Sequence, residues 1–175
     1  MMRENVMGRL ETIYRYPIKG CRGVRVEAAD VTTSGLVGDR QWVLVNGQGV
    51  VNQKILPTLR FLEVVESEKG LIISLKGSGS IGVDQSLIEP TASIQSIGRE
   101  VPCVRAGGAV SDWLSNAFGQ PLQLVRATSG VPLSLDGTPF QQLHGSTQSA
   151  FVDIAPILIV GLESLTDLNL SLIHI

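Results

Sequence analysis

Residues 16–23 read YPIKGCRG and residues 35–42 read GLVGDRQW, and these two stretches carry the decisive pattern of the chain. In the first, Lys19 lies in a turn directly before Gly20; in the second, Arg40 lies at the entry to a strand. Glycines flank both cations, and a glycine lets the main chain approach a ligand closely. Arginine binds phosphate as a planar fork, whereas lysine acts as a mobile point charge. The two stretches therefore predict a local site for an anionic ligand.

The order of these residues resembles the opening of the MOSC-domain molybdenum-cofactor proteins, a family that includes the mitochondrial amidoxime-reducing component and its bacterial relatives. The shared pattern is Y-P-(I/V)-K, a small residue, a basic residue and glycine, followed by G-x-x-x-D-R-x-W. Further similarity runs from about residue 9 to residue 169, in segments 50–54, 112–114, 125–126 and 164–169 and at Pro57 and Leu59.

The resemblance implies a mainly β fold with an α/β part. It implies a MOSC N-terminal β-barrel domain at residues 8–105, then a linking helix and the beginning of a MOSC β-barrel domain at residues 106–169. The metal-ligating cysteine of the family is expected beyond residue 169, so we interpret the chain as C-terminally truncated.

Bulk properties exclude several classes of protein. The chain has 175 residues, 43% of them apolar and 17% charged, which suits one sizeable core and not a disordered chain or a coiled coil. A net charge of −2 argues against nonspecific nucleic-acid binding. Pro156 interrupts the longest apolar run, and residues 1–10 lack the apolar core of a signal peptide. Cys21 and Cys103 are far apart, so we expect a reduced, cytoplasmic setting without membrane contact.

The first half of the chain has the periodicity of strands. Alternation over residues 10–16 and 24–28 is typical of strands with one buried face, and the apolar run 41–45 of a strand buried on both faces. Asn46-Gly47 predicts a hairpin turn, and a second hairpin is expected between residues 60–65 and 71–75. Short strands with glycine-rich turns favour a barrel or a sandwich.

The second half is predicted to be mixed. A loop is expected at residues 76–82, because they are rich in glycine and serine. A helix is expected at 109–118, capped by Ser111 or Asp112 and stopped by Gly119. After this helix, the sequence predicts a strand at 122–127, a long loop at 128–149, a buried strand at 157–160 and the start of a helix at 164–169.

Residues 170–175, LSLIHI, need a separate interpretation. The codons CTG TCT CTT ATA CAC ATC, the mosaic end of a widely used transposase-based sequencing adapter, encode this string. Our hypothesis is that these residues are adapter read-through and that the native sequence is interrupted after Asn169. The alternative is a native apolar turn of helix.

By resemblance, six residues are expected to bind the molybdenum cofactor (molybdopterin). Lys19 and Arg40 would neutralise its phosphate end, and Gly20 would offer a backbone N–H where relatives often carry serine. Asp153 would accept hydrogen bonds from the pterin. Ile154 and Ala155 follow it where relatives carry small hydroxylated residues, so they can offer only backbone contacts.

Each of these assignments has a simpler alternative. Lys19 can be a solvated lysine at a turn, and most lysines are solvated. Arg40 can form a surface pair with Asp39, which would contribute little to stability. Asp153 can cap a local turn.

Other reactive side chains are expected to have no catalytic role. A lone cysteine is most often a small buried residue, so neither Cys21 nor Cys103 is predicted to bind metal. Trp42 is expected in the core, and His144 lies in a polar loop. We assign no catalytic residue and no metal ligand within the chain.

The resemblance implies that the full-length protein is a molybdenum-cofactor oxidoreductase that reduces small N-hydroxylated compounds. Its electrons would come from a redox partner or an appended 2Fe-2S domain, and this chain alone is expected to be inactive. Two alternatives belong to other classes: a non-catalytic β-barrel module that binds an anion or a partner, and an accessory domain for sulfur transfer of the molybdenum cofactor sulfurase type. A pyridoxal-phosphate domain upstream would favour sulfur transfer.

Overall fold

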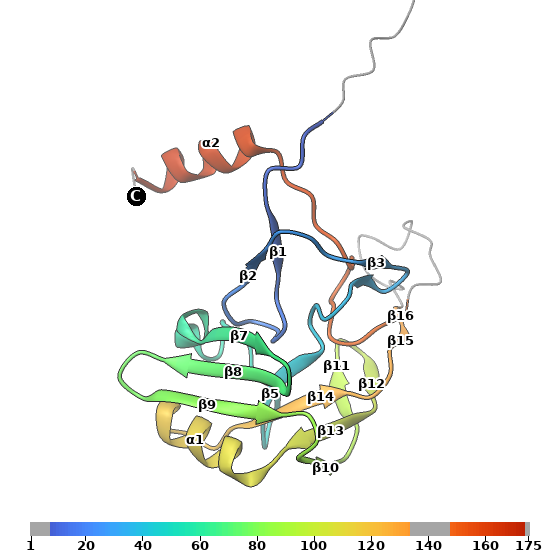
Figure 1. The fold of residues 1–175 in the computed structure, drawn as a ribbon, viewed down its shortest axis with the longest axis vertical. Helices are drawn as coiled ribbons and strands as arrows, with labels where there is room; N and C mark the ends of the chain where they lie inside the picture. The colour runs from blue at the N-terminus through green and yellow to red at the C-terminus, as the bar shows by residue number, and fades with distance from the viewer. Residues whose placement is uncertain (1–7, 134–147, 174–175) are drawn as a thin grey trace, which may run out of the picture.

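A computed structural model describes residues 8–133 and 148–173, and most of its regular elements are short antiparallel strands (Figure 1). The largest sheet has five strands in the order β10-β13-β14-β5-β6. These strands span β5 Trp42–Asn46, β6 Gly49–Val50, β10 Ile88–Pro90, β13 Cys103–Ala106 and β14 Gln123–Ala127.

A three-stranded sheet, β7-β8-β9, packs beside it, with strands β7 Glu63–Ser67, β8 Gly70–Leu75 and β9 Gly79–Asp84. Four two-stranded sheets complete the β structure: β1 Ile13–Arg15 with β2 Val24–Val26, β3 Val31–Thr32 with β4 Gly35–Leu36, β11 Ile94–Ser96 with β12 Arg99–Val101, and β15 Val131–Pro132 with β16 Gln148–Ser149. The helical elements are the 3-10 helix η1 Pro57–Phe61 and the α-helices α1 Gly108–Phe118 and α2 Leu162–Ile173.

The five-stranded sheet is buried on both faces, as the apolar run 41–45 predicts. Trp42 and Leu44 point into a first core cluster, which also receives side chains from η1, the three-stranded sheet and α1. Val43 and Val45 point the other way, into a second cluster with Val125. Alternate side chains of β5 therefore hold two cores together, as the period of two in a strand requires.

Several local predictions are confirmed. The hairpins β5–β6 and β7–β8 form, and α1 ends at Gly119, which adopts the left-handed conformation. The Asn46 side chain stabilises the turn of the first hairpin, because its Oδ1 accepts a hydrogen bond of 2.9 Å from the Gln48 N–H. Trp42 lies in the core, as expected.

Two predictions for the middle of the chain are wrong. The stretch 76–82 is not a loop throughout, since Gly79–Asp84 forms β9 and pairs with β8 over its whole length. Ladder hydrogen bonds need only backbone groups, so a strand next to a well-formed neighbour tolerates glycine and serine. Helix α1 begins at Gly108, with Gly107 as N-cap and no side-chain cap, and not at Ser111 or Asp112.

The first two strands alternate in exposure, as expected for strands with one buried face. In β2, Val24 and Val26 are half-buried, as the alternation predicts. In β1, Ile13 and Arg15 are the less exposed residues, whereas Tyr14 between them is exposed. The inward direction of Arg15 follows from its polar partners, described below.

The predicted buried strand at 157–160 is also wrong. These residues form no strand and are exposed, Leu158 by 81%. Burial of a strand requires neighbours on its faces and edges, and in the described ranges no strand pairs with this segment. Beyond it, α2 confirms the helix expected from residue 164 and extends away from the sheets (Figure 1). The helix includes Leu170, and a helical conformation does not test the adapter hypothesis.

The turn between β11 and β12 has a strained backbone, and a substitution can remove this strain. Ile97 and Gly98 both have positive φ, 49° and 70°, and a β-branched residue is poorly suited to this conformation. Asn-Gly is the preferred pair for such a two-residue turn. We expect Ile97→Asn to raise the free energy of unfolding by about 1 kcal/mol in urea titrations.

A matched substitution at the next residue separates backbone strain from packing. Space around Gly98 is open, so Gly98→Ala meets no neighbour and only the conformational cost applies. We expect Gly98→Ala to lower the free energy of unfolding by about 1 kcal/mol. Destabilisation by Ile97→Asn would contradict the strain assignment.

Candidate functional site

Residues 16–19 and 40–42 lie side by side as a short parallel pairing. The Arg40 N–H donates to the Tyr16 carbonyl at 2.7 Å, and the Trp42 N–H donates to the Pro17 carbonyl at 3.0 Å. The Lys19 N–H in turn donates to the Trp42 carbonyl at 2.8 Å. The two stretches singled out from sequence are therefore neighbours in space, as an anion site built from both requires.

Asp39 holds this pairing together from the inside. Its side chain is only 5% exposed, its Oδ1 accepts a 2.7 Å hydrogen bond from the Tyr16 N–H, and its other oxygen pairs with Arg40. Arg40 has a positive φ of 48°, which aims its side chain back toward that carboxylate. The Asp39–Arg40 pair exists, as the simpler interpretation of Arg40 expects, but its acid is buried.

The Tyr16 ring explains two further residues of the decisive pattern. The Arg40 guanidinium lies 5.5 Å from the centre of the ring, within range of a cation–π contact. A Cβ atom at position 23 would lie 2.7 Å from the same ring, so only glycine fits there. The ring thus contacts both stretches of the pattern.

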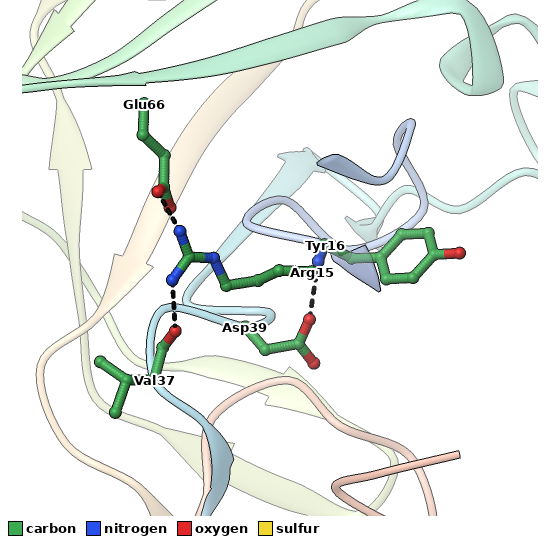
Figure 2. A network of polar contacts seen from close by, with 5 residues as sticks. All are labelled: Arg15, Tyr16, Val37, Asp39 and Glu66. Carbon is green, nitrogen blue, oxygen red and sulfur yellow. Dashed lines mark hydrogen bonds and ion pairs between the residues drawn. The ribbon is translucent and has the colours of Figure 1, made fainter. Parts of the chain in front are cut away.

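Arg15 fastens this region to the three-stranded sheet (Figure 2). Its guanidinium donates to the Val37 carbonyl at 2.9 Å and pairs with Glu66 on β7. Figure 2 shows the Arg15 side chain reaching toward both partners, while the Asp39 carboxylate points at the Tyr16 nitrogen. Arg15 therefore faces inward in β1 because its charge is satisfied there.

Lys19 reaches the second predicted part of the site. Its ammonium pairs with the Asp153 carboxylate, 134 residues away in the chain. The Lys19 side chain is 13% exposed and the Asp153 side chain 50% exposed, so the lysine is enclosed and the acid is open to solvent. The structure thus brings together the two residues that resemblance assigns to opposite ends of one cofactor.

Each partner follows a deeply buried anchor. Ile18 is fully buried in the first core cluster, and Phe151 is fully buried in the second. The chain after Asp153 is also confined, because a Cβ at Gly35 would lie 2.8 Å from Pro156. Packing on both faces of the central sheet therefore sets where Lys19 and Asp153 meet.

The remaining predicted residues of the site are Gly20, Ile154 and Ala155. Gly20 has a φ of +78°, a conformation that L side chains rarely adopt, which accounts for glycine there. Its carbonyl accepts a 2.8 Å hydrogen bond from the Gln53 side chain. Ile154 and Ala155 are exposed directly after Asp153.

Arg99 belongs to this region and was not predicted from the sequence. It is 7% exposed, and its guanidinium donates to the Val152 carbonyl directly before Asp153. Burial lowers the pKa of Arg99 below its ordinary value, and the negative charge of Asp153 opposes that shift. A single arginine in a strand gives no sequence signal of such a role.

The two cysteines are small buried residues, as the sequence interpretation expects. Cys21 and Cys103 are both buried, and burial raises the pKa of the Cys21 thiol to about 12 and that of Cys103 to about 11. Thiols with such pKa values stay protonated near neutral pH. Among residues 8–133 and 148–173, no group of three or more His, Cys, Asp or Glu side chains could hold a metal ion. His144 lies outside the described residues.

No helix within these same ranges is long and apolar enough to cross a membrane.

Comparison with known proteins shows the family of the chain. Residues 7–121 match the family described as the MOSC N-terminal beta barrel domain. A molybdenum cofactor sulfurase of Oryza sativa is 30% identical over 169 residues, which cover 91% of this chain and 20% of the relative. The mitochondrial amidoxime-reducing component 1 of Homo sapiens is 25% identical and component 2 of Bos taurus is 25% identical; each match covers 93% of this chain and 51% of the relative. The chain therefore spans about half the length of these reducing components and a fifth of that sulfurase.

The geometry predicts that Asp39 is a stability residue of the site. Asp39→Ala leaves the Tyr16 N–H without its part-buried acceptor and Arg40 without its carboxylate partner. We expect the free energy of unfolding to fall by about 2 kcal/mol in urea titrations. Asp30→Ala, which removes an exposed carboxylate, is the control and should change it by less than about 0.5 kcal/mol. Equal effects of the two substitutions would contradict the buried role of Asp39.

Proposed function

This chain belongs to the family of the MOSC N-terminal β-barrel domain, and we propose that it holds the pterin and phosphate end of a molybdenum cofactor. The observation that carries the proposal is the contact between Lys19 and Asp153. Two residues 134 positions apart meet there, and the Lys19 N–H is bonded to the carbonyl of Trp42, two residues after Arg40. The relatives are named for a molybdenum cofactor or for amidoxime reduction.

The residues present fit the anionic end of such a cofactor. Asp153 is half exposed and Lys19 is mostly enclosed, so an incoming phosphate can replace the carboxylate as the partner of the lysine. Because the acid is half exposed, water can solvate its carboxylate after the exchange, which lowers the free-energy cost of releasing it. Arg40 is tied to buried Asp39, yet its side chain is 29% exposed and retains donors of its fork for a second anion oxygen.

In this proposal each residue has a separate part. Lys19 neutralises a phosphate oxygen as a point charge, and Arg40 fixes the orientation of the phosphate through its planar fork. Asp153, once released by the lysine, accepts hydrogen bonds from N–H groups of the pterin. Gly20, Ile154 and Ala155 would offer backbone contacts only.

The whole protein, of which this chain would be the cofactor-holding part, is proposed to be an oxidoreductase for small N-hydroxylated compounds. The bound cofactor supplies the oxygen-atom chemistry, and the protein supplies binding, orientation and electrostatics. Electrons would come from a redox partner or an appended 2Fe-2S domain. By the family resemblance, the metal ligand is proposed to be a cysteine that lies outside the described residues.

A second candidate is an accessory role in sulfur transfer to the cofactor. The 30% identity to the Oryza sativa molybdenum cofactor sulfurase favours it. Both candidates use the same anion site, so they differ in what surrounds this chain in the full-length protein. A pyridoxal-phosphate lysine domain upstream would support sulfur transfer, whereas a metal-ligating cysteine downstream would support the oxidoreductase.

The shared proposal predicts the effect of removing both cations. In the full-length protein, Lys19→Ala combined with Arg40→Ala should lower pterin occupancy roughly tenfold or more, because each lost charged hydrogen bond costs about 1.5–3 kcal/mol. Occupancy is measured by releasing the pterin, oxidising it and quantifying its fluorescence per mole of folded protein.

The matched control is Lys69→Ala combined with Arg25→Ala, which removes one lysine and one arginine from exposed positions. This control should retain the occupancy of the unsubstituted protein. Full occupancy in the Lys19 and Arg40 double variant would show that the phosphate end binds elsewhere.

A further inference from the structure

Arg99 is held in an unusual position for an arginine. It begins β12 and pairs across the tight turn with Ser96 of β11, and both residues are buried. The short β11–β12 hairpin therefore delivers a guanidinium into the interior beside the second core cluster. Arginine is rarely this deeply buried unless it is paired.

The Arg99 guanidinium contacts the segment of the chain that ends in Asp153. One terminal nitrogen donates to the Val152 carbonyl. The other, Nη1, is buried and has no hydrogen-bond partner among the described residues. The Asp153 carboxylate lies close enough to favour the charged form of the guanidinium. No other acid is a cause of the shift in the pKa of Arg99.

Asp153 itself has few other constraints. Its side chain is half exposed, and its described partner is the Lys19 ammonium. Phe151 and Val152 are buried, so they fix the chain up to the residue before the acid. The Arg99 bond to the Val152 carbonyl controls the direction in which the chain leaves the core.

We propose that Arg99 is a positioning residue that fixes the 152–153 backbone and balances the Asp153 carboxylate from the interior. Asp153 is then paired with the Lys19 ammonium and directly follows the carbonyl that Arg99 holds from the interior. When an anion takes Lys19, the acid keeps a counter-charge and stays in place. Only the incoming anion in this inference rests on the proposed function. The position of Asp153 can be measured without any ligand.

A purely structural arginine would behave differently. Its removal would change the unfolding equilibrium constant of every variant by the same factor and would leave the interaction between Lys19 and Asp153 unchanged. A positioning residue changes that interaction itself. A double-mutant cycle measures the interaction separately from overall stability.

The experiment uses the 175-residue chain without ligand. Urea unfolding of the unsubstituted protein, Lys19→Met, Asp153→Asn and the double variant gives the coupling between the two side chains. We expect coupling of about threefold in the unfolding equilibrium constant, within the range measured for partly exposed ion pairs. The same cycle is then repeated in an Arg99→Met background, where coupling should fall to about onefold, meaning none.

Three further backgrounds sharpen the result. Arg99→Gln loses the charge and the reach of the guanidinium while staying polar, so it should also abolish coupling and serves if Arg99→Met does not fold. Arg99→Lys keeps the charge and should rescue part of the coupling. Arg105→Met, which removes an arginine paired with Glu89 on β10, is the control and should leave coupling unchanged.

Unchanged coupling in Arg99→Met or Arg99→Gln, with only the overall stability reduced, would overturn the proposal. Absence of coupling in the unsubstituted protein would overturn it as well. Neither result would decide the proposed function, because the pterin occupancy of the Lys19 and Arg40 variants tests that separately.

Discussion

The parallel pairing of residues 16–19 with residues 40–42 is the constraint on which the rest of the site depends. Three backbone hydrogen bonds of 2.7–3.0 Å form it, and the buried Asp39 carboxylate closes it by accepting from the Tyr16 N–H. Ile18 and Trp42 lie within the pairing and are anchored in one core cluster. A cation on each paired segment is therefore held by core packing and not by a flexible loop, which is the pre-organisation that binding of an anion requires.

The two cations are paired with acids that differ in burial. Arg40 is tied to an acid that is almost fully buried, whereas Lys19 is tied to one that is half exposed. Removing a buried carboxylate from its partner costs much more than exchanging an exposed one. Arg40 is thus suited to orient a ligand and Lys19 to exchange partners. The exchangeable pair also joins the two core clusters, because Ile18 precedes the lysine and Phe151 lies just before the acid.

Sequence patterns predicted the elements that depend on local periodicity and turn residues. Strand β5, the two hairpins that follow it and the end of α1 at Gly119 are of this kind. Patterns failed where neighbours decide the outcome: β9 is a strand because β8 pairs with it, and 157–160 is not one because no described strand does. Lys19 and Arg40 were predicted as an anion site from the glycines beside them, and the family resemblance added Asp153. Arg99 and the buried state of Asp39 were missed, because burial of a single charged residue depends on contacts distant in sequence.

The most direct test of the account is a zero-length cross-link between Lys19 and Asp153. Carbodiimide couples an amine to a carboxylate only when the two groups are in contact, and mass spectrometry of the digested protein identifies the joined peptides. The account predicts a cross-link between these residues, 134 positions apart, that is lost in Lys19→Met and in Asp153→Asn. Absence of this link in the folded protein, or attachment of Lys19 to a different carboxylate, would contradict the arrangement on which the proposed site depends.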